Sequence, residues 1–155
     1  MVDDGLVTRV LARALEARAA GDHPFGALLA VDGEVVAEAR NLVSTNRDIT
    51  AHAETELVRV LERDGLLGLL PDGVVYASCE PCPQCVGALF WAGARHVVFA
   101  LSAARLAEIS TAPDTAPYGF TITAAELAAA TTRPVRVDGP RREDEAAQAH
   151  HGFWF

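Results

Sequence analysis

Hydrophobic residues near the start of the chain recur at a spacing of three or four, at Leu6, Val7, Val10, Leu11 and Leu15. This spacing is typical of an amphipathic helix, which we expect over residues 4–20. Gly21 and Asp22 interrupt the hydrophobic pattern and should end that helix.

Shorter hydrophobic runs further along the chain have the length of β-strands. The expected strands are residues 24–31, 34–40, 73–78, 94–101 and 133–139. Asp32-Gly33 lies between the first two runs and is a strong signal for a two-residue hairpin turn. The chain therefore starts its sheet with an antiparallel pair.

Helices are expected between and after these strands, at residues 51–64, 82–92, 102–109, 123–131 and 141–150. Thr50 ends a polar loop over 41–50 and can cap the first of these helices. The later strands alternate with helices, which predicts an α/β fold with a mostly parallel sheet and helices on both faces. The hairpin makes the sheet mixed, and a length of 155 residues suits one domain.

The composition narrows the class of partner. The net charge is −8 and all 13 basic residues are arginines, which disfavours a nucleic-acid partner and favours a small neutral substrate. No hydrophobic run reaches the roughly 18 residues of a membrane-spanning helix. The amphipathic start, with two early aspartates, does not resemble a secretory signal, so we expect a cytoplasmic protein with no membrane partner.

The three cysteines are clustered at Cys79, Cys82 and Cys85. An odd, tightly spaced set is a poor disulfide framework and is more typical of metal or redox sites. A helix that starts at Cys82 would place Cys82 and Cys85 on one face, where both thiolates can reach a zinc ion. We interpret Cys79 as a buried structural thiol, because a fourth protein ligand would close the site.

His52-Ala53-Glu54 stands at another expected helix start, and both helices follow a loop after a strand. Their N-termini should meet at one edge of the sheet, where the helix dipoles favour anionic ligands. His52, Cys82 and Cys85 would hold one Zn²⁺ per chain and leave its fourth position open, as in catalytic sites. Glu54 could flank the metal and carry protons between an activated water and a substrate.

Each half of this pattern is weak alone. A redox pair leaves His52 and Glu54 unexplained, and a structural zinc has no need for Glu54. Together, the two halves match the zinc-deaminase signature H-x-E followed by P-C-x-x-C. A structural zinc site and a non-enzymatic, zinc-stabilised accessory protein remain the alternatives.

Residues 50–56 and 76–85 resemble the cytidine deaminase-like superfamily, in particular its guanine deaminase and tRNA adenosine deaminase branch. The similarity extends over 23–41 and 88–100 and fades beyond residue 101. It implies a three-layer α/β/α fold with a central five-stranded mixed sheet, and a single zinc-dependent deaminase domain over 1–155. The implied reaction releases ammonia from a purine or purine-like nucleobase or nucleoside.

The resemblance also implies roles for individual residues. His52, Cys82 and Cys85 match the zinc ligands, and Glu54 matches the catalytic acid and base. The implied substrate-binding residues are Asn41, Phe25, Ala53, Trp91, Phe153 and Trp154. Without the resemblance, Asn41 could equally be a turn former, and Phe25 and Trp91 could equally be core residues.

The substrate stays open at this stage. Guanine deaminases carry an acidic recognition residue near the position of Arg105 in this chain. The alternatives are a tRNA adenosine deaminase, which needs a basic surface, and a deaminase of a cytosine, triazine or pterin ring.

The chain ends in His150-His151-Gly152-Phe153-Trp154-Phe155. Three terminal aromatic rings seldom stay in solvent. The resemblance implies that the tail, 140–155, could cap an active site in its own chain or across a homodimer, which we expect. Packing onto the parent domain is an equal alternative, and a second metal site at the paired histidines is not expected.

Overall fold

The structure, a computed structural model, describes residues 2–155. Its first half contains α1 (Asp4–Ala19), β1 (Gly26–Val31), β2 (Glu34–Arg40), α2 (Val43–Asn46), α3 (Ala53–Arg63), β3 (Val74–Cys79) and α4 (Pro83–Ala92). Its second half contains β4 (His96–Leu101), α5 (Ala103–Ser110), α6 (Ala124–Ala129), β5 (Arg136–Asp138) and α7 (Glu143–Ala147). Single 3₁₀ turns lie at Leu67–Leu69 and Gln148–His150.

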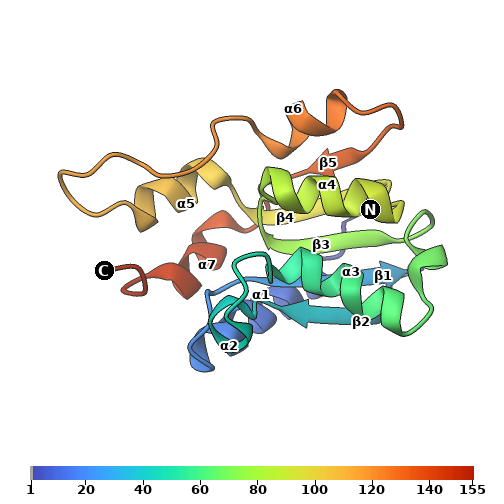
Figure 1. The fold of residues 1–155 in the computed structure, drawn as a ribbon, viewed down its shortest axis with the longest axis horizontal. Coiled ribbons are helices and arrows are strands. Elements are labelled where there is room, and N and C mark those ends of the chain that lie inside the picture. Colours follow the sequence, from blue (N-terminus) through green and yellow to red (C-terminus); the bar gives the residue numbers. More distant parts are fainter. Residues whose placement is uncertain (1) are drawn as a thin grey trace.

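The five strands form one mixed sheet, as expected, and their order is β2-β1-β3-β4-β5 (Figure 1). β1 runs antiparallel to both β2 and β3, whereas β3, β4 and β5 are parallel to one another. The expectation of a mostly parallel sheet is therefore right only for the second half, because β1 reverses direction against β3 as well as against its hairpin partner.

Helices cover both faces of the sheet, because alternate strand residues point to opposite sides. Leu28 and Ala30 of β1 pack with α1 and α7, and α5 lies against the same cluster. Ala27 and Leu29 of the same strand pack with α3 and α4. This arrangement confirms the three-layer α/β/α class.

The two functional helices begin slightly later than expected. His52, rather than Thr50, is the N-cap of α3, and Cys82 is the N-cap of α4. The hydroxyl and N–H groups of Thr50 are instead bonded to the Asp48 carboxylate at 2.7 and 2.8 Å. Two of the three expected zinc ligands thus occupy the cap positions themselves.

Other boundaries shift where local pattern is weak. The polar loop 41–50 contains the short helix α2, and the strand expected over 133–139 is reduced to Arg136–Asp138. Within residues 2–155, none of the helices combines the length and hydrophobicity needed to cross a membrane.

A buried carboxylate fixes the turn after β2. Asp22 is fully buried and accepts hydrogen bonds from Arg40 at 2.8 Å and from the N–H and hydroxyl of Thr45 at 2.8 and 2.6 Å. Burial works against ionisation, but these hydrogen bonds prevail and lower the pKa of Asp22. The end of α1 is thereby tied to the segment that carries Asn41.

Candidate metal centre

The N-termini of α3 and α4 meet at one edge of the sheet. His52 and Cys82 both precede their helices with extended backbone, and Cys85 is the third residue of α4. Unpaired N–H groups at helix starts carry partial positive charge, which stabilises nearby thiolates. The expectation that both motifs share one edge is confirmed by a cluster of His52, Cys82 and Cys85 ligand atoms within 4.8 Å of one another.

The ligand atoms have the spacing of a zinc tetrahedron. Sγ of Cys82 lies 3.5 Å from Nδ1 of His52 and 3.6 Å from Sγ of Cys85, which is itself 3.5 Å from Nδ1 of His52. Bonds of about 2.3 Å to sulfur and about 2.0–2.1 Å to nitrogen separate tetrahedral ligands by about 3.5–3.8 Å. Two thiolates and one imidazole therefore fit zinc and leave one corner for a substrate or water.

The ligands also influence one another's protonation. A hydrogen bond from Cys85 and a second contact with His52 lower the pKa of Cys82 to about 4. The hydrogen bond with Cys82 raises the pKa of His52. The pKa of Cys85 is also raised, because Cys85 donates its proton to Cys82 and is buried. One thiolate is thus already stabilised by the fold, and a metal ion deprotonates a coordinating thiol outright.

Glu54 lies beside the ligands and belongs to the first turn of α3. Its side chain is only 6% exposed, and its Oε2 is 3.2 Å from Sγ of Cys85. Burial raises the pKa of Glu54 to about 7. A carboxyl group that titrates near neutral pH can both accept and donate a proton, as general acid–base catalysis requires.

These groups line a cavity of about 190 Å³. Phe25 forms part of its wall, together with Cys79, Glu80 and Leu106, and its role in substrate binding stays a prediction. Burial keeps the pKa of the Cys79 thiol well above its usual range, and this thiol therefore stays protonated. The interpretation of Cys79 as a structural thiol stays a prediction.

Sequence reasoning missed two residues of this wall. Glu80 stands between two cysteines of the motif, so its position in the loop could have marked it. Leu106 comes from α5, beyond the segment of resemblance, and no local signal indicates that it faces the metal.

Asn41 and Ala53 lie close to the same edge of the sheet. Asn41 is 1% exposed, and its Oδ1 accepts a hydrogen bond from the N–H of Val43 at 3.0 Å. Its amide NH₂ group is therefore the part left to meet a ligand. Ala53 is buried at the first position of α3, where a helix provides no partner for the N–H group. Their contacts with substrate stay predictions.

Trp91 does not join the cavity in this chain. Its side chain is 82% exposed on α4, where it pairs with Phe90, and it is not part of the cavity wall. The motif places Cys85 toward the metal, and a residue six positions later on a 3.6-residue helix faces elsewhere. The structure therefore does not bring Trp91 to the metal cavity of its own chain, and its contact with a substrate stays a prediction.

The C-terminal tail folds back onto its own chain. Phe153 and Trp154 have ring centroids 6.0 and 5.4 Å from His23, and Trp154 lies 6.1 Å from Phe25. Trp154 also stacks on His150, which is buried against Phe25 at 5.2 Å. Phe153 and Trp154 thus lie next to the cavity wall without being part of it.

Arg18 holds this tail in place from the last turn of α1. Its Nη1 donates to the carbonyl groups of Ala149 and His151, each at 2.8 Å, and its guanidinium lies 5.7 Å from the ring centre of Phe153. One side chain therefore fixes both the backbone and an aromatic ring of the tail.

Comparison with known proteins agrees with this geometry. Residues 2–101 match the family described as the cytidine and deoxycytidylate deaminase zinc-binding region. The chain belongs to this family. As a member of it, the protein is a zinc-dependent hydrolase that deaminates a substrate at a C–N bond. The match ends with β4, so α5 and the tail lie outside it.

Several curated relatives are similar to the chain over different lengths. A "probable cytosine deaminase" of Schizosaccharomyces pombe is 36% identical over 143 residues, which cover 90% of this chain and 84% of the relative. The guanine deaminase of Bacillus subtilis is 46% identical over 79 residues, about half of each protein. A tRNA-specific adenosine deaminase of Bacillus subtilis is 34% identical, and the match spans 60% of its length.

Solved structures share the fold. The crystal structure of guanine deaminase from Bacillus subtilis aligns with a TM-score of 0.63 at 33% identity, covering 82% of this chain and 90% of the other. A structure from a study of tRNA:A34 deaminases aligns with a TM-score of 0.74 at 25% identity, covering 95% and 99%. These likenesses confirm the deaminase fold and leave the substrate open.

Proposed function

We propose that this zinc-dependent deaminase acts on a purine or purine-like nucleobase or nucleoside, in the manner of a guanine deaminase. The observation that carries the proposal is the buried Glu54 carboxylate beside three zinc-ligand atoms in a small cavity. The local similarity to guanine deaminase, 46% over 79 residues, supports the choice of ring.

His52, Cys82 and Cys85 would hold zinc, which lowers the pKa of a bound water to about 7 and so supplies the nucleophile. Glu54 would take one proton from the attacking water, whose oxygen bonds to the amino-bearing carbon, and pass it to a ring nitrogen of the substrate. Glu54 would then carry the second proton of that water to the departing amino group. The carbon–nitrogen bond breaks, a carbonyl group forms, and ammonia leaves.

Residues around the cavity would hold the ring. Phe25 and Leu106 provide apolar walls, and the amide NH₂ of Asn41 and the N–H of Ala53 are available donors at the edge of the sheet. Phe153 and Trp154 would close the mouth from the far side of Phe25. The tail, 140–155, acts in this proposal as a cap on the single domain.

A cytosine ring is the second candidate, and one observation favours it. The similarity to the S. pombe relative runs over 143 residues and therefore includes part of the region after β4, the region that supplies Leu106 to the wall of the metal cavity. A transfer RNA is the weakest candidate, because a net charge of −8 disfavours the phosphate contacts that supply most of the affinity for nucleic acid. We further propose a cytoplasmic homodimer.

A screen for ammonia release tests the proposal. The zinc-loaded chain is incubated with guanine, adenine, cytosine, their nucleosides, pterins and triazines, with the Glu54→Gln variant as a matched control. Ammonia from a purine in the wild type alone supports the proposal. Ammonia from cytosine alone selects the second candidate, and no ammonia from any ring by a chain that holds zinc overturns both.

A further inference from the structure

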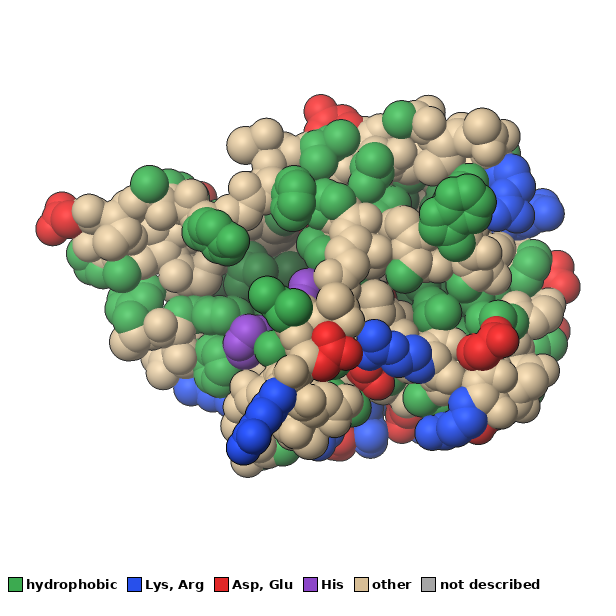
Figure 2. Space-filling view, viewed as in Figure 1, with side chains coloured by type: hydrophobic (Ala, Val, Ile, Leu, Met, Phe, Trp, Pro, Cys, Tyr) green, Lys and Arg blue, Asp and Glu red, His purple; other side chains and the backbone are tan. Residues whose placement is uncertain are grey.

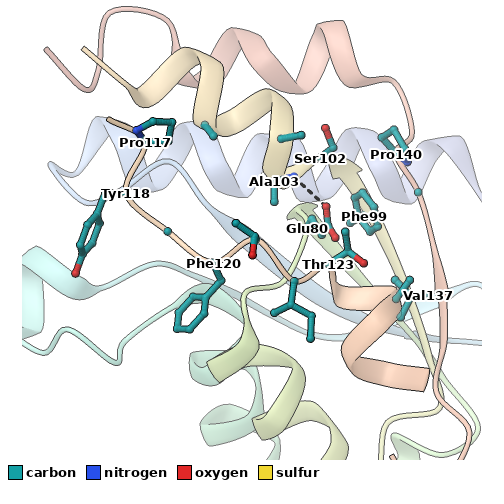
Figure 3. Close-up of a pocket in the computed structure, with 17 residues that line it drawn as sticks. Glu80, Phe99, Ser102, Ala103, Pro117, Tyr118, Phe120, Thr123, Val137 and Pro140 are labelled. Carbon is teal, nitrogen blue, oxygen red and sulfur yellow. Dashed lines mark hydrogen bonds between the residues drawn. The ribbon is translucent and has the colours of Figure 1, made fainter. Parts of the chain in front are cut away.

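One carboxylate in the metal loop, residues 80–82 between β3 and α4, holds two helices that come later in the chain. Oε2 of Glu80 accepts a hydrogen bond from the N–H of Ala103 (Figure 3), and Oε1 accepts one from the N–H of Ala124, each at 2.9 Å. Ala103 and Ala124 are the first residues of α5 and α6, whose N–H groups have no partner within the helix. Glu80 therefore clamps both ends of the segment 103–123 to the metal loop.

The first helix of this clamped segment, α5, separates two cavities. A cavity of about 590 Å³ lies between α5, residues 117–123, α6 and β5 (Figure 3). Ala103 and Ala107 of α5 line this larger cavity, whereas Leu106 of the same helix lines the cavity of about 190 Å³ at the zinc ligands, the metal cavity. Glu80 borders both, so α5 and Glu80 form a wall that the two cavities share.

Leu106 lies one helical turn beyond the point that Glu80 holds. Its N–H donates to the carbonyl of Ser102 at 2.9 Å, so the position of Leu106 follows from that of the first turn of α5. Figure 2 shows this face of the molecule hollowed between α5 and the starts of α3 and α4, with hydrophobic side chains along the hollow. A shift of Ala103 would therefore move a wall of the metal cavity.

The main chain of Glu80 is held independently of its carboxylate. The N–H of Glu80 donates to the carbonyl of Leu101, the last residue of β4, at 2.7 Å. At the start of α4, the N–H of Val86 donates to the carbonyl of Cys82 at 2.9 Å. Loss of the carboxylate alone should leave these backbone bonds, and with them the zinc ligands, in place.

A second carboxylate holds the start of α5 from the tail. Oε1 of Glu143, the first residue of α7, accepts a hydrogen bond from the N–H of Ser102 at 2.9 Å. Ser102 is the N-cap of α5, next to Ala103. The start of α5 is thus tied to the tail by Glu143 and to the metal loop by Glu80. The tie through Glu80 is the one that leads to the loop that carries Cys82.

We propose that Glu80 is a positioning residue that sets the distance between the zinc ligands and the α5 wall of the metal cavity, and thereby the fit of the substrate ring. The proposal rests on the proposed function in one respect, since it takes a ring bound in the metal cavity as the substrate. The family match ends at residue 101, so Glu80 lies inside the match and clamps a segment beyond it. Glu80 would thus join the metal centre common to the family to a wall built by the later part of the chain.

Amide hydrogen exchange of the zinc-loaded chain tests the clamp without a substrate. Glu80→Ala removes both acceptors and should speed exchange in peptides from α5 and α6 by about 10-fold or more, because exchange reports local opening. Peptides from α3 and α4, and the zinc content, should stay at the wild-type values. Glu80→Gln keeps the size of the side chain and one acceptor oxygen, so its exchange rates should lie between those of Glu80→Ala and the wild type.

Steady-state kinetics on the ring that the wild type deaminates test the position of the wall. Glu80→Ala should raise KM by about 10-fold with a smaller change in kcat, because the wall contacts the ring in the ground state as well as in the transition state. Glu80→Gln should recover part of this loss. Glu126→Gln is the matched control, because the Glu126 carboxylate caps α6 through Thr123 rather than through the metal loop. This control should keep the wild-type KM.

Unchanged exchange in Glu80→Ala overturns the proposal, and so does a wild-type KM in a variant whose exchange has increased. Zinc loss from both Glu80 variants would also overturn it, because Glu80 would then support the ligands rather than the wall. An equal rise in KM in Glu126→Gln would assign the effect to α6 alone and contradict the role of the metal loop. A wild type that releases ammonia from no ring would instead remove the proposed function, and the exchange rates alone would then decide whether Glu80 holds the segment.

Discussion

The carboxylate of Glu54 lies 3.2 Å from the sulfur of Cys85, against the metal ligands and outside the set that binds the metal. Glu54→Gln should therefore keep about one zinc per chain while losing ammonia release by about 10²–10⁴-fold, the usual contribution of a general acid or base. Metal analysis and an ammonia assay on the same preparation check both parts. A glutamine variant with wild-type activity would remove Glu54 from the chemistry.

Cys79 and Cys85 should respond differently to the same substitution. Cys85→Ala removes a ligand and should abolish both tight zinc binding and activity, because two remaining ligands hold zinc poorly. Cys79→Ala deletes a buried thiol outside the ligand cluster and should keep its zinc. Zinc content after dialysis measures the difference between the two variants. Zinc loss from Cys79→Ala would contradict the interpretation of Cys79 as a structural thiol.

In the wild type, a chelator should remove the deaminase activity and added zinc should restore it.

The buried His150 should make the protein sensitive to acid. Burial lowers the pKa of His150 to about 4, below its ordinary value of 6.5. The unfolded chain therefore binds this proton more readily, and the stabilisation present above pH 6.5 is lost as the pH falls toward 4. The loss amounts to roughly 3 kcal/mol at 1.36 kcal/mol per pKa unit.

Denaturant unfolding at several pH values checks this prediction. The difference in unfolding free energy between wild type and His150→Gln isolates this residue from the metal ligands, which titrate in both proteins. His151→Gln, at an exposed neighbour, serves as the control and should follow the wild type. Equal pH slopes for wild type and His150→Gln would contradict the prediction.

Arg18→Ala should release the tail, because it removes two hydrogen bonds to tail carbonyls and the contact with Phe153. Hydrogen bonds from a charged donor each contribute about 1.5–3 kcal/mol. In a Trp91→Phe background, the fluorescence of Trp154 should shift to longer wavelength as that ring becomes hydrated. Arg63→Ala, which removes only an exposed pair with Asp64, should leave the emission unchanged. An unchanged spectrum in Arg18→Ala would show that the aromatic packing suffices.

The metal centre could be predicted because its information is local. His52, Glu54, Cys82 and Cys85 occupy two short segments, and each segment starts a helix at the same sheet edge. Helix starts after strands are set by local pattern, so the juxtaposition followed from topology.

The surroundings of the metal could not be predicted in the same way. Leu106 reaches the cavity because α5 packs across the sheet edge, and Trp91 leaves it because of its rotational position on α4. Both depend on how helices pack in three dimensions. The tail contacts of His150 join residues more than 120 positions apart, which no local pattern encodes.

The shared wall of α5 has a consequence for kinetics. One face of this short helix encloses the metal cavity through Leu106, and the other, with Ala107, lines the cavity of about 590 Å³ between α5, α6 and β5. A larger side chain at Ala107 would therefore press on the wall against which a substrate rests. Ala107→Leu should change KM while the zinc content stays at the wild-type value, and kinetics with metal analysis on the same preparation would reveal this dependence.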